Sequence, residues 1–305
     1  MPCYHPLQGW RKQGGGLTFN LRDGFVDRPV TVSCGQCIGC RLERSRQWAV
    51  RCMHEASLHT DNCFITLTYD DDGLSHLPRC VDPETGEIGA GPFHSLNKRD
   101  IQLFFKRLRK RTGAKIRYFQ CGEYGVKGET KRPHHHAILF GFDFKDKYLY
   151  GRNHRVGVNY YRSPLLEELW PHGMSVVGDM TFESAAYVAR YCVKKMTGVK
   201  ADPHYLGRLP DYVSMSLKPG IAHDWISNNL DDVYPLDRVY VRPGVLARPP
   251  KYYDKIYDLE KKDFFRIRRN RELQASKRPR DSVRRLIDRE VCANLRAAQL
   301  VRNLD

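Results

Sequence analysis

The 305-residue sequence predicts an α+β protein with a central antiparallel sheet flanked by helices. Segments 63–69, 115–122 and 134–140 are rich in β-branched and aromatic residues, which is typical of strands. A glycine-rich, polar connection joins the last two, and it favours a hairpin with antiparallel pairing. Segments 101–110 and 182–196 place apolar residues at helical spacing and alternate with the strands.

Four segments are expected along the chain. Residues 1–60 form a Cys-rich N-terminal segment that includes a basic helix, and residues 61–205 form the core. Prolines interrupt residues 206–250, which predicts an irregular extension. Residues 251–305 carry sixteen Lys and Arg against nine Asp and Glu, so we expect a basic helical tail of one or two helices split at Pro279.

Smaller elements follow from local signals. Asn97 or Asp100 is expected to cap the helix at 101–110, and Gly113 to end it. Residues 1–33 are expected to be irregular apart from a short strand. The other predicted elements are helices at 41–58 and 165–170 and strands at 30–33, 174–178 and 213–216.

The charge of the chain points to a polyanionic partner. The net charge is +16 and the isoelectric point about 9.4, which favours nucleic acid first and an anionic membrane second. No apolar run is long enough to span a membrane, and the N-terminus lacks a secretory signal pattern. We therefore expect a cytosolic protein whose ten cysteines are thiols or metal ligands rather than disulfides.

Three cysteines recur at Cys34-Gly-Gln-Cys37-Ile-Gly-Cys40, a spacing that lets them bind one soft metal ion. This pattern predicts a structural Zn²⁺ site, with free thiols or an iron–sulfur cluster as alternatives. The candidates for a fourth ligand are Cys3, which we assign, and His5, Cys52 and His54.

A buried strand that starts with three consecutive histidines is predicted within Lys131-Arg-Pro-His134-His135-His136-Ala-Ile-Leu-Phe140. Side chains alternate between the faces of a strand, so His134 and His136 share one face, about 6.6 Å apart, and His135 points to the other. The hairpin places Glu123, at the end of the preceding strand, beside His134. Two imidazoles and one carboxylate with open positions predict a divalent-metal site; a solvent-facing His run is the alternative.

The helix at 182–196 contains Tyr187-Val-Ala-Arg-Tyr191-Cys-Val-Lys194, two consecutive copies of Tyr-x-x-basic. Spacing of four puts both phenols on one helix face. Paired phenols with cations nearby suit covalent attack on phosphates, whereas an amphipathic helix that simply buries two tyrosines is the other interpretation.

Taken in order, the strand 64–69, the triple histidine and the doubled tyrosine resemble the three motifs of the HUH endonucleases that initiate rolling-circle replication. The chain is most similar to the replication initiators of gokushovirus-type microviruses, which are small single-stranded-DNA phages. The cysteine motif and residues 121–125 and 213–220 are similar to that family too, so the resemblance runs to about residue 250. Between the two metal-binding histidines the family usually has a bulky hydrophobic residue, where this chain has His135.

The resemblance implies an HUH fold, with a ferredoxin- or RRM-like antiparallel sheet, and a nicking and joining mechanism. It implies that Glu123, His134 and His136 hold Mg²⁺ or Mn²⁺ on the scissile phosphate. Tyr187 or Tyr191 then attacks, leaving a 5′-phosphotyrosine and a 3′-hydroxyl that a polymerase extends. Lys194 or Lys195 is expected to assist.

The expected partner is single-stranded or locally melted origin DNA in the cytoplasm of a bacterial host, together with host helicase and polymerase. Two other classes stay open: a transposase or plasmid relaxase of the same superfamily, and a non-catalytic zinc-containing DNA-binding protein. The residues expected to contact the DNA backbone are Arg41, Arg44, Lys106, Arg107, Arg109 and Lys110.

Overall fold

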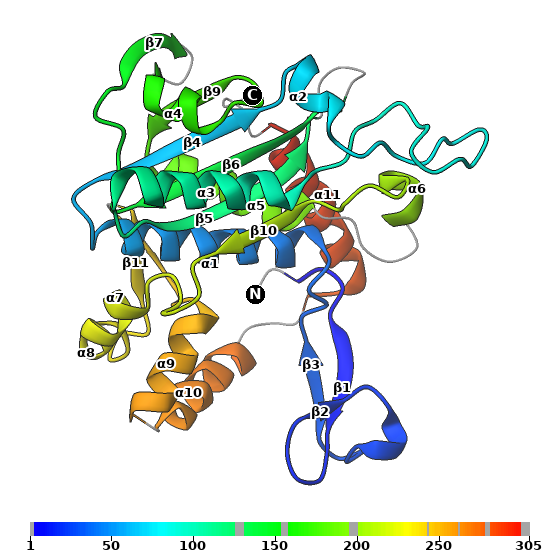
Figure 1. The fold of residues 1–305 in the computed structure, drawn as a ribbon. Helices are drawn as coiled ribbons and strands as arrows, with labels where there is room; N and C mark the ends of the chain where they lie inside the picture. Colours follow the sequence, from blue (N-terminus) through cyan, green and yellow to red (C-terminus); the bar gives the residue numbers. More distant parts are fainter. Residues whose placement is uncertain are drawn as a thin grey trace. The chain divides into compact units, whose positions relative to one another are not determined.

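The structure is a computed structural model that describes residues 3–125, 131–153, 158–194, 201–242, 244–261, 263–277 and 281–299 (Figure 1). The side chains of 153, 190–194 and 242 lie outside this description. The chain forms two compact units, one of residues 1–44 with 268–305 and one of residues 45–267. The division into four segments expected from the sequence remains a prediction.

The larger unit is built on one antiparallel sheet (Figure 1). Among the described residues it has seven strands, in the spatial order β10 (Tyr212–Met215), β5 (Arg117–Tyr124), β6 (Pro133–Phe140), β4 (Asn62–Thr68), β9 (Ser175–Asp179), β8 (Val158–Arg162) and β7 (Tyr148–Asn153). Every neighbouring pair is antiparallel. The predicted α+β class with an antiparallel sheet flanked by helices is confirmed.

A large hydrophobic core lies between one face of this sheet and helices α3 (Lys98–Thr112) and α4 (Pro164–Leu169). Strand β4 contributes Ile65 and Leu67, and α3 contributes Phe104 and Leu108, all fully buried. Burying side chains of this size stabilises the fold by about 1.5–3 kcal/mol each. Since β6 is flanked by β5 and β4, its residues are held on both edges.

The ends of α3 follow the predicted signals. The Asn97 side chain accepts a hydrogen bond from the Arg99 N–H, and Gly113 ends the helix with a left-handed φ of 66°. The opposite face of the sheet carries α5 (Phe182–Lys194) and α1 (Ile38–Ala56). On α1, the Trp48 ring lies 4.9 Å from the Phe119 ring of β5.

The N-terminal segment is more regular than expected, because β1 (Leu7–Arg11) pairs with both β2 (Leu17–Thr18) and β3 (Pro29–Val32). Only the last of these strands was predicted. β1 is mostly exposed and β2 has only two residues, so both lack the alternation of buried and polar residues that identifies a strand. A 3₁₀ turn, η1 (Leu21–Asp23), lies between β2 and β3.

The expectation of an irregular region after residue 205 is also wrong in part. The structure has β11 (Val239–Arg242) paired with β12 (Val245–Ala247), and the described part of the tail contains three helices rather than one or two. Pro279 lies outside the described residues. The remaining helices are α2 (Asp71–Ser75), α6 (Ala201–Tyr205), α7 (His223–Asn228), α8 (Leu230–Val233), α9 (Lys251–Lys261), α10 (Phe264–Ser276) and α11 (Val283–Gln299).

No helix in the described ranges is both long enough and apolar enough to cross a membrane.

Candidate active site

The candidate metal ligands lie on the neighbouring strands β5 and β6. Their register places Glu123 opposite His134 and Cys121 opposite His136. Glu123, His134 and His136 therefore face the same side of the sheet, as strand alternation predicts. Their three ligand atoms lie within 4.8 Å of one another.

A single carboxylate oxygen connects the two imidazoles. Glu123 Oε1 lies 2.9 Å from Nε2 of His134 and 3.2 Å from Nε2 of His136. Only the His134 side chain is appreciably open to solvent, at 12% exposure, while Glu123 and His136 are each 1% exposed. Burial alone would raise the pKa of Glu123, but hydrogen bonds from both histidines lower it, so the carboxylate is ionised.

The hydrogen bonds of His134 fit a bound cation. Its Nδ1 lies 3.2 Å from the carbonyl oxygen of Arg132, which only accepts hydrogen bonds, so Nδ1 carries the proton. Nε2 donates a second hydrogen bond to the ionised Glu123. A cation bound between Nε2 and the carboxylate would take the place of that proton while Nδ1–H keeps its carbonyl partner, which is the arrangement of a metal-binding histidine.

Thr66 is a site residue that the sequence prediction missed. Its hydroxyl lies 2.9 Å from Nδ1 of His136, and β4 pairs it directly opposite that histidine. This contact directs Nε2 of His136 toward Glu123. The alternation of β4 shows on which face of the sheet Thr66 lies. Its position opposite His136 could be predicted only with the order of the strands in the sheet.

The two tyrosines of the doubled motif are both in α5, which begins after the cap formed by the Thr181 hydroxyl and the Ser184 N–H. Tyr187 is 3% exposed, and its hydroxyl lies 3.5 Å from Nε2 of His136. Its ring meets the His136 ring edge-on, with centroids 5.1 Å apart. The side chains of Tyr191 and Lys194 lie outside the described residues, as does all of Lys195.

His135 points to the opposite face of the sheet and belongs to the core. It is fully buried, and its Nε2 lies 3.2 Å from the Tyr69 hydroxyl. Burial lowers its pKa to about 3, so the ring is neutral. Its position matches the bulky hydrophobic residue that the resemblance implies there.

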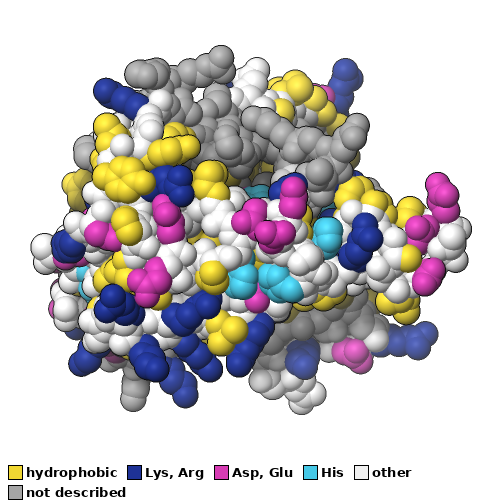
Figure 2. All heavy atoms as spheres, turned by 45° about the horizontal axis from the view of Figure 1, so that its top comes forward, with side chains coloured by type: hydrophobic (Ala, Val, Ile, Leu, Met, Phe, Trp, Pro, Cys, Tyr) yellow, Lys and Arg dark blue, Asp and Glu magenta, His cyan; other side chains and the backbone are white. Residues whose placement is uncertain are grey.

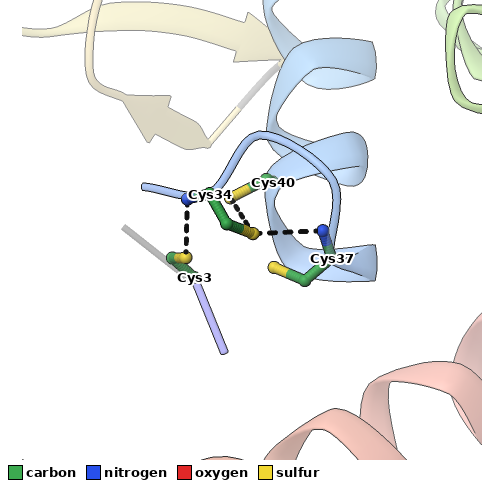
Figure 3. Close-up of side chains that lie close together, drawn as sticks. All are labelled: Cys3, Cys34, Cys37 and Cys40. Carbon is green, nitrogen blue, oxygen red and sulfur yellow. Dashed lines mark hydrogen bonds between the residues drawn. The ribbon is translucent and has the colours of Figure 1, made fainter. Parts of the chain in front are cut away.

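The smaller unit brings four cysteines together at the start of α1 (Figure 3). Cys34 Sγ lies 4.0 Å from Cys40 Sγ, and the Cys34 N–H donates to Cys3 Sγ. Two sulfur ligands of one tetrahedral zinc lie about 3.8 Å apart, so this spacing fits a metal site. Among the candidates for the fourth ligand, the structure groups Cys3 with the other three.

Backbone N–H groups also favour thiolate in this cluster. Burial opposes ionisation of Cys37, but hydrogen bonds such as that from the Tyr4 N–H lower its pKa to about 7. Burial and the neighbouring Cys37 raise the pKa of Cys40. Cys37 and Cys40 therefore hold their protons unequally, as expected for groups that interact closely.

The predicted DNA-contacting residues differ in how free they are. Lys106 and Lys110 are exposed, whereas Arg109 donates to the carbonyl oxygen of Ile116 at 2.8 Å and the exposed Arg44 donates to that of Gly35 at 3.3 Å. Arg107 is half-buried, and Arg41 takes part in other interactions. Figure 2 shows Lys and Arg side chains gathered at the lower left of the face drawn.

Known phage proteins are similar to this chain. The family model for replication-associated protein ORF2/G2P matches residues 62–196, which include Glu123, both candidate histidine ligands and the two tyrosines. The chain is 33% identical over 272 residues to the replication-associated protein VP4 of Bdellovibrio phage phiMH2K, across 84% of this chain and 77% of that protein.

Two further relatives have similar names. The replication-associated protein ORF2 of Spiroplasma virus 4 is 31% identical over 319 aligned residues, across 96% of this chain and 91% of that protein. The replication-associated protein ORF4 of Chlamydia phage 1 is 36% identical over 190 residues, across 58% of this chain and 42% of that protein. No solved structure matches the chain. The resemblance inferred from the sequence is therefore confirmed: this chain belongs to the family of replication-associated proteins found in microvirus-like phages.

Proposed function

We propose that the chain is an HUH endonuclease that nicks and rejoins single-stranded DNA to initiate rolling-circle replication of a phage genome. The observation that carries the proposal is the 3.5 Å separation between the Tyr187 hydroxyl and Nε2 of His136. It puts a candidate nucleophile next to a candidate metal ligand. Family membership supports the role in replication.

Glu123, His134 and His136 are the residues that would hold the catalytic ion. A bound Mg²⁺ or Mn²⁺ supplies a positive charge that polarises the scissile phosphate and stabilises the charge developing on its oxygens. Nitrogen ligands favour Mn²⁺ in affinity, and cellular abundance favours Mg²⁺. His134 is the most exposed of the three ligands, so the phosphate approaches from its side.

The reaction begins with a phenol that has lost its proton to water. The oxygen of Tyr187 or Tyr191 bonds to phosphorus, the bond from phosphorus to the 3′ oxygen breaks, and that oxygen takes a proton from water. The products are a 5′-phosphotyrosine and a free 3′-hydroxyl. The covalent link keeps the bond energy, so attack by a DNA hydroxyl reverses the step and rejoins the ends. Lys194 and Lys195 are the candidates for assisting the phenol.

The substrate is single-stranded or locally melted origin DNA, because the metal ion and the phenol must both reach one exposed phosphate. The net charge of +16 supports attraction to the DNA backbone. The free 3′-hydroxyl suits a host polymerase working with a host helicase, in the cytoplasm of the infected bacterium. Cys3, Cys34, Cys37 and Cys40 hold a structural Zn²⁺ in this proposal.

The test is to incubate the full chain with end-labelled single-stranded origin DNA and Mn²⁺ and to look for a covalent adduct on a denaturing gel. We expect an adduct that EDTA abolishes. The matched control carries both Tyr187→Phe and Tyr191→Phe, which should still bind DNA without forming the adduct. An adduct from this double variant would falsify the mechanism, as would undiminished nicking in EDTA.

A further inference from the structure

The α3 side of the sheet carries a second cluster of metal-binding side chains, separate from the candidate active site. His76, Asp100 and His172 each offer one ligand atom, and these atoms all lie within 4.8 Å of one another. His76 ends α2, Asp100 lies in the first turn of α3, and His172 lies in the loop between α4 and β9. The proposed nuclease chemistry uses none of them.

The spacing of these groups fits a bound ion as well as a long hydrogen bond. His76 Nε2 lies 3.4 Å from Asp100 Oδ2, at the long end of the hydrogen-bond range. Two ligands about 2.0–2.1 Å from a tetrahedral ion lie about 3.4 Å apart. The rings of His76 and His172 are also adjacent, with centroids 4.9 Å apart.

The carboxylate is held in place as metal-binding carboxylates usually are. Oδ1 of Asp100 accepts a hydrogen bond from the Asn97 side chain at 3.1 Å, and Oδ2 accepts one from the Tyr69 hydroxyl at 2.9 Å. Each oxygen retains a lone pair, because a carboxylate oxygen accepts two hydrogen bonds. Such outer contacts orient the ligands of metal sites and strengthen binding.

The backbone around His172 also approaches the start of α2 closely. The His172 carbonyl oxygen accepts a hydrogen bond from the Asp70 N–H at 3.0 Å. A Cβ added to Gly73 would lie 2.0 Å from that oxygen, and one added to Gly173 would lie 2.4 Å from the Asp70 nitrogen. Glycine at both positions therefore lets the loop pack against α2, which brings the two histidines together.

Charge and exposure favour a cation with water in its coordination sphere. Asp100 is 7% exposed in its side chain and His76 is 40% exposed, so solvent reaches one side of the cluster. The groups that act electrostatically on His172 are Asp100 and Asp70, which are negative, Arg107, which is positive, and the neighbouring His76. Two carboxylates thus lie near the cluster.

We propose that His76, Asp100 and His172 bind one divalent transition-metal ion. Two imidazoles and a carboxylate suit Zn²⁺, and water completes the coordination. The ion ties together α2, the start of α3 and the loop before β9. Tyr69 links this site to strand β6, since its hydroxyl contacts both Asp100 and His135, the core residue between the two candidate histidine ligands.

The test measures metal binding rather than nuclease activity, so it does not depend on the proposed function. Metal-free full chain is titrated with Zn²⁺ and with Co²⁺, and bound metal is measured by elemental analysis after dialysis. Wild type should hold one more ion per chain than His76→Ala or His172→Ala. In each variant the affinity of this site for Zn²⁺ should fall about 100-fold or more. That loss exceeds the 10–100-fold that removal of an outer-shell partner typically causes. The double variant that carries both His134→Ala and His136→Ala should retain this ion.

The matched control is His223→Ala, since His223 lies 3.3 Å from Asp224 but belongs to no three-ligand cluster among the described residues. It should bind metal as wild type does. His172→Cys supplies a different zinc ligand and should restore binding, with a new thiolate-to-cobalt band that His172→Ala lacks. The proposal is overturned if His76→Ala, an exposed change, binds as much metal as wild type, or if His172→Cys adds no band.

Discussion

The hydroxyl of Thr66 lies 2.9 Å from Nδ1 of His136. A contact on the second nitrogen of a metal-binding histidine fixes the orientation of the ring and typically contributes 10–100-fold, about 1.4–2.8 kcal/mol, to metal affinity. Thr66 is therefore a positioning residue of the candidate active site.

Thr66→Val should weaken Mn²⁺ binding about 10–100-fold and leave the fold intact, because the two side chains have nearly the same shape. Nicking should fall at low Mn²⁺ and recover at high Mn²⁺. The matched control is Thr68→Val, since Thr68 lies two residues on and opposite His134 but bonds the Met174 carbonyl instead. Equal effects of the two changes would contradict the assignment.

The three consecutive histidines should respond unequally to substitution. His134→Ala and His136→Ala should each abolish divalent-dependent cleavage, because each removes a ligand. His135→Leu should retain most activity and cost no more than about 1.5 kcal/mol of folding free energy, since it exchanges a buried neutral ring for an apolar side chain of similar size. Nicking assays with urea unfolding as the stability control test this, and equal loss from all three changes would count against the site.

The two tyrosines should be partly interchangeable. Tyr187→Phe alone or Tyr191→Phe alone should leave a single nicking event detectable, because the remaining hydroxyl attacks. Either change should impair the later transfer of DNA from one tyrosine to the other. A time course on labelled origin DNA separates the two steps. If only one variant fails at the first nick, the tyrosines act in a fixed order.

The cysteine cluster should hold one zinc that resists mild removal of the catalytic ion. Elemental analysis after brief EDTA treatment should find about one zinc per chain in the wild type. The same measurement on Cys37→Ser should find that zinc reduced or absent. Native protein free of both zinc and iron, with all of these thiols open to titration, would overturn the assignment.

Acid should destabilise the larger unit through His54. Burial lowers its pKa to about 4; Nδ1 lies 2.8 Å from the Tyr253 hydroxyl and the ring stacks on Trp225. The unfolded imidazole titrates near 6.5, so its stabilising effect is complete above that pH and is lost as the pH falls toward 4. The loss between pH 7 and pH 5 is about 2 kcal/mol.

Urea unfolding at these two pH values measures this dependence. Other buried histidines, such as His135, act in the same direction. The decisive quantity is therefore the difference between wild type and His54→Gln, whose own pH dependence should be smaller by about the same amount. An unchanged dependence in the variant would show that His54 does not titrate as stated.

Local rules were sufficient to group the three candidate metal ligands of the active site. A hairpin fixes which residues face one another, and alternation fixes which share a face, so Glu123, His134 and His136 could be grouped without coordinates. The helix α3 was equally accessible, because Asn97 and Gly113 mark its two ends. In both cases the decisive information lies within about twenty residues of sequence.

Features that depend on distant segments were not predictable in this way. Strand β7 is mostly exposed and β8 is half-buried along its whole length, so neither shows the alternation of buried and exposed residues that identifies a strand. His76, Asp100 and His172 come from three separate segments, and no spacing in the sequence connects them. The close contact of Thr66 with His136 likewise depends on strand order.

The alternation of residues 134–136 between the two faces of the sheet makes a shifted pairing of β6 with its neighbours unfavourable. A shift by one residue would turn His134 and His136 into the layer occupied by Leu67 and Phe104 and would place His135 beside Glu123. One imidazole would still meet the carboxylate, but two would enter the core, where the Tyr69 hydroxyl now contacts a single imidazole, and an imidazole left without a partner costs about 1–3 kcal/mol or more. The shifted register would thus be less stable than the native one, and this difference already exists in the protein before any DNA is bound.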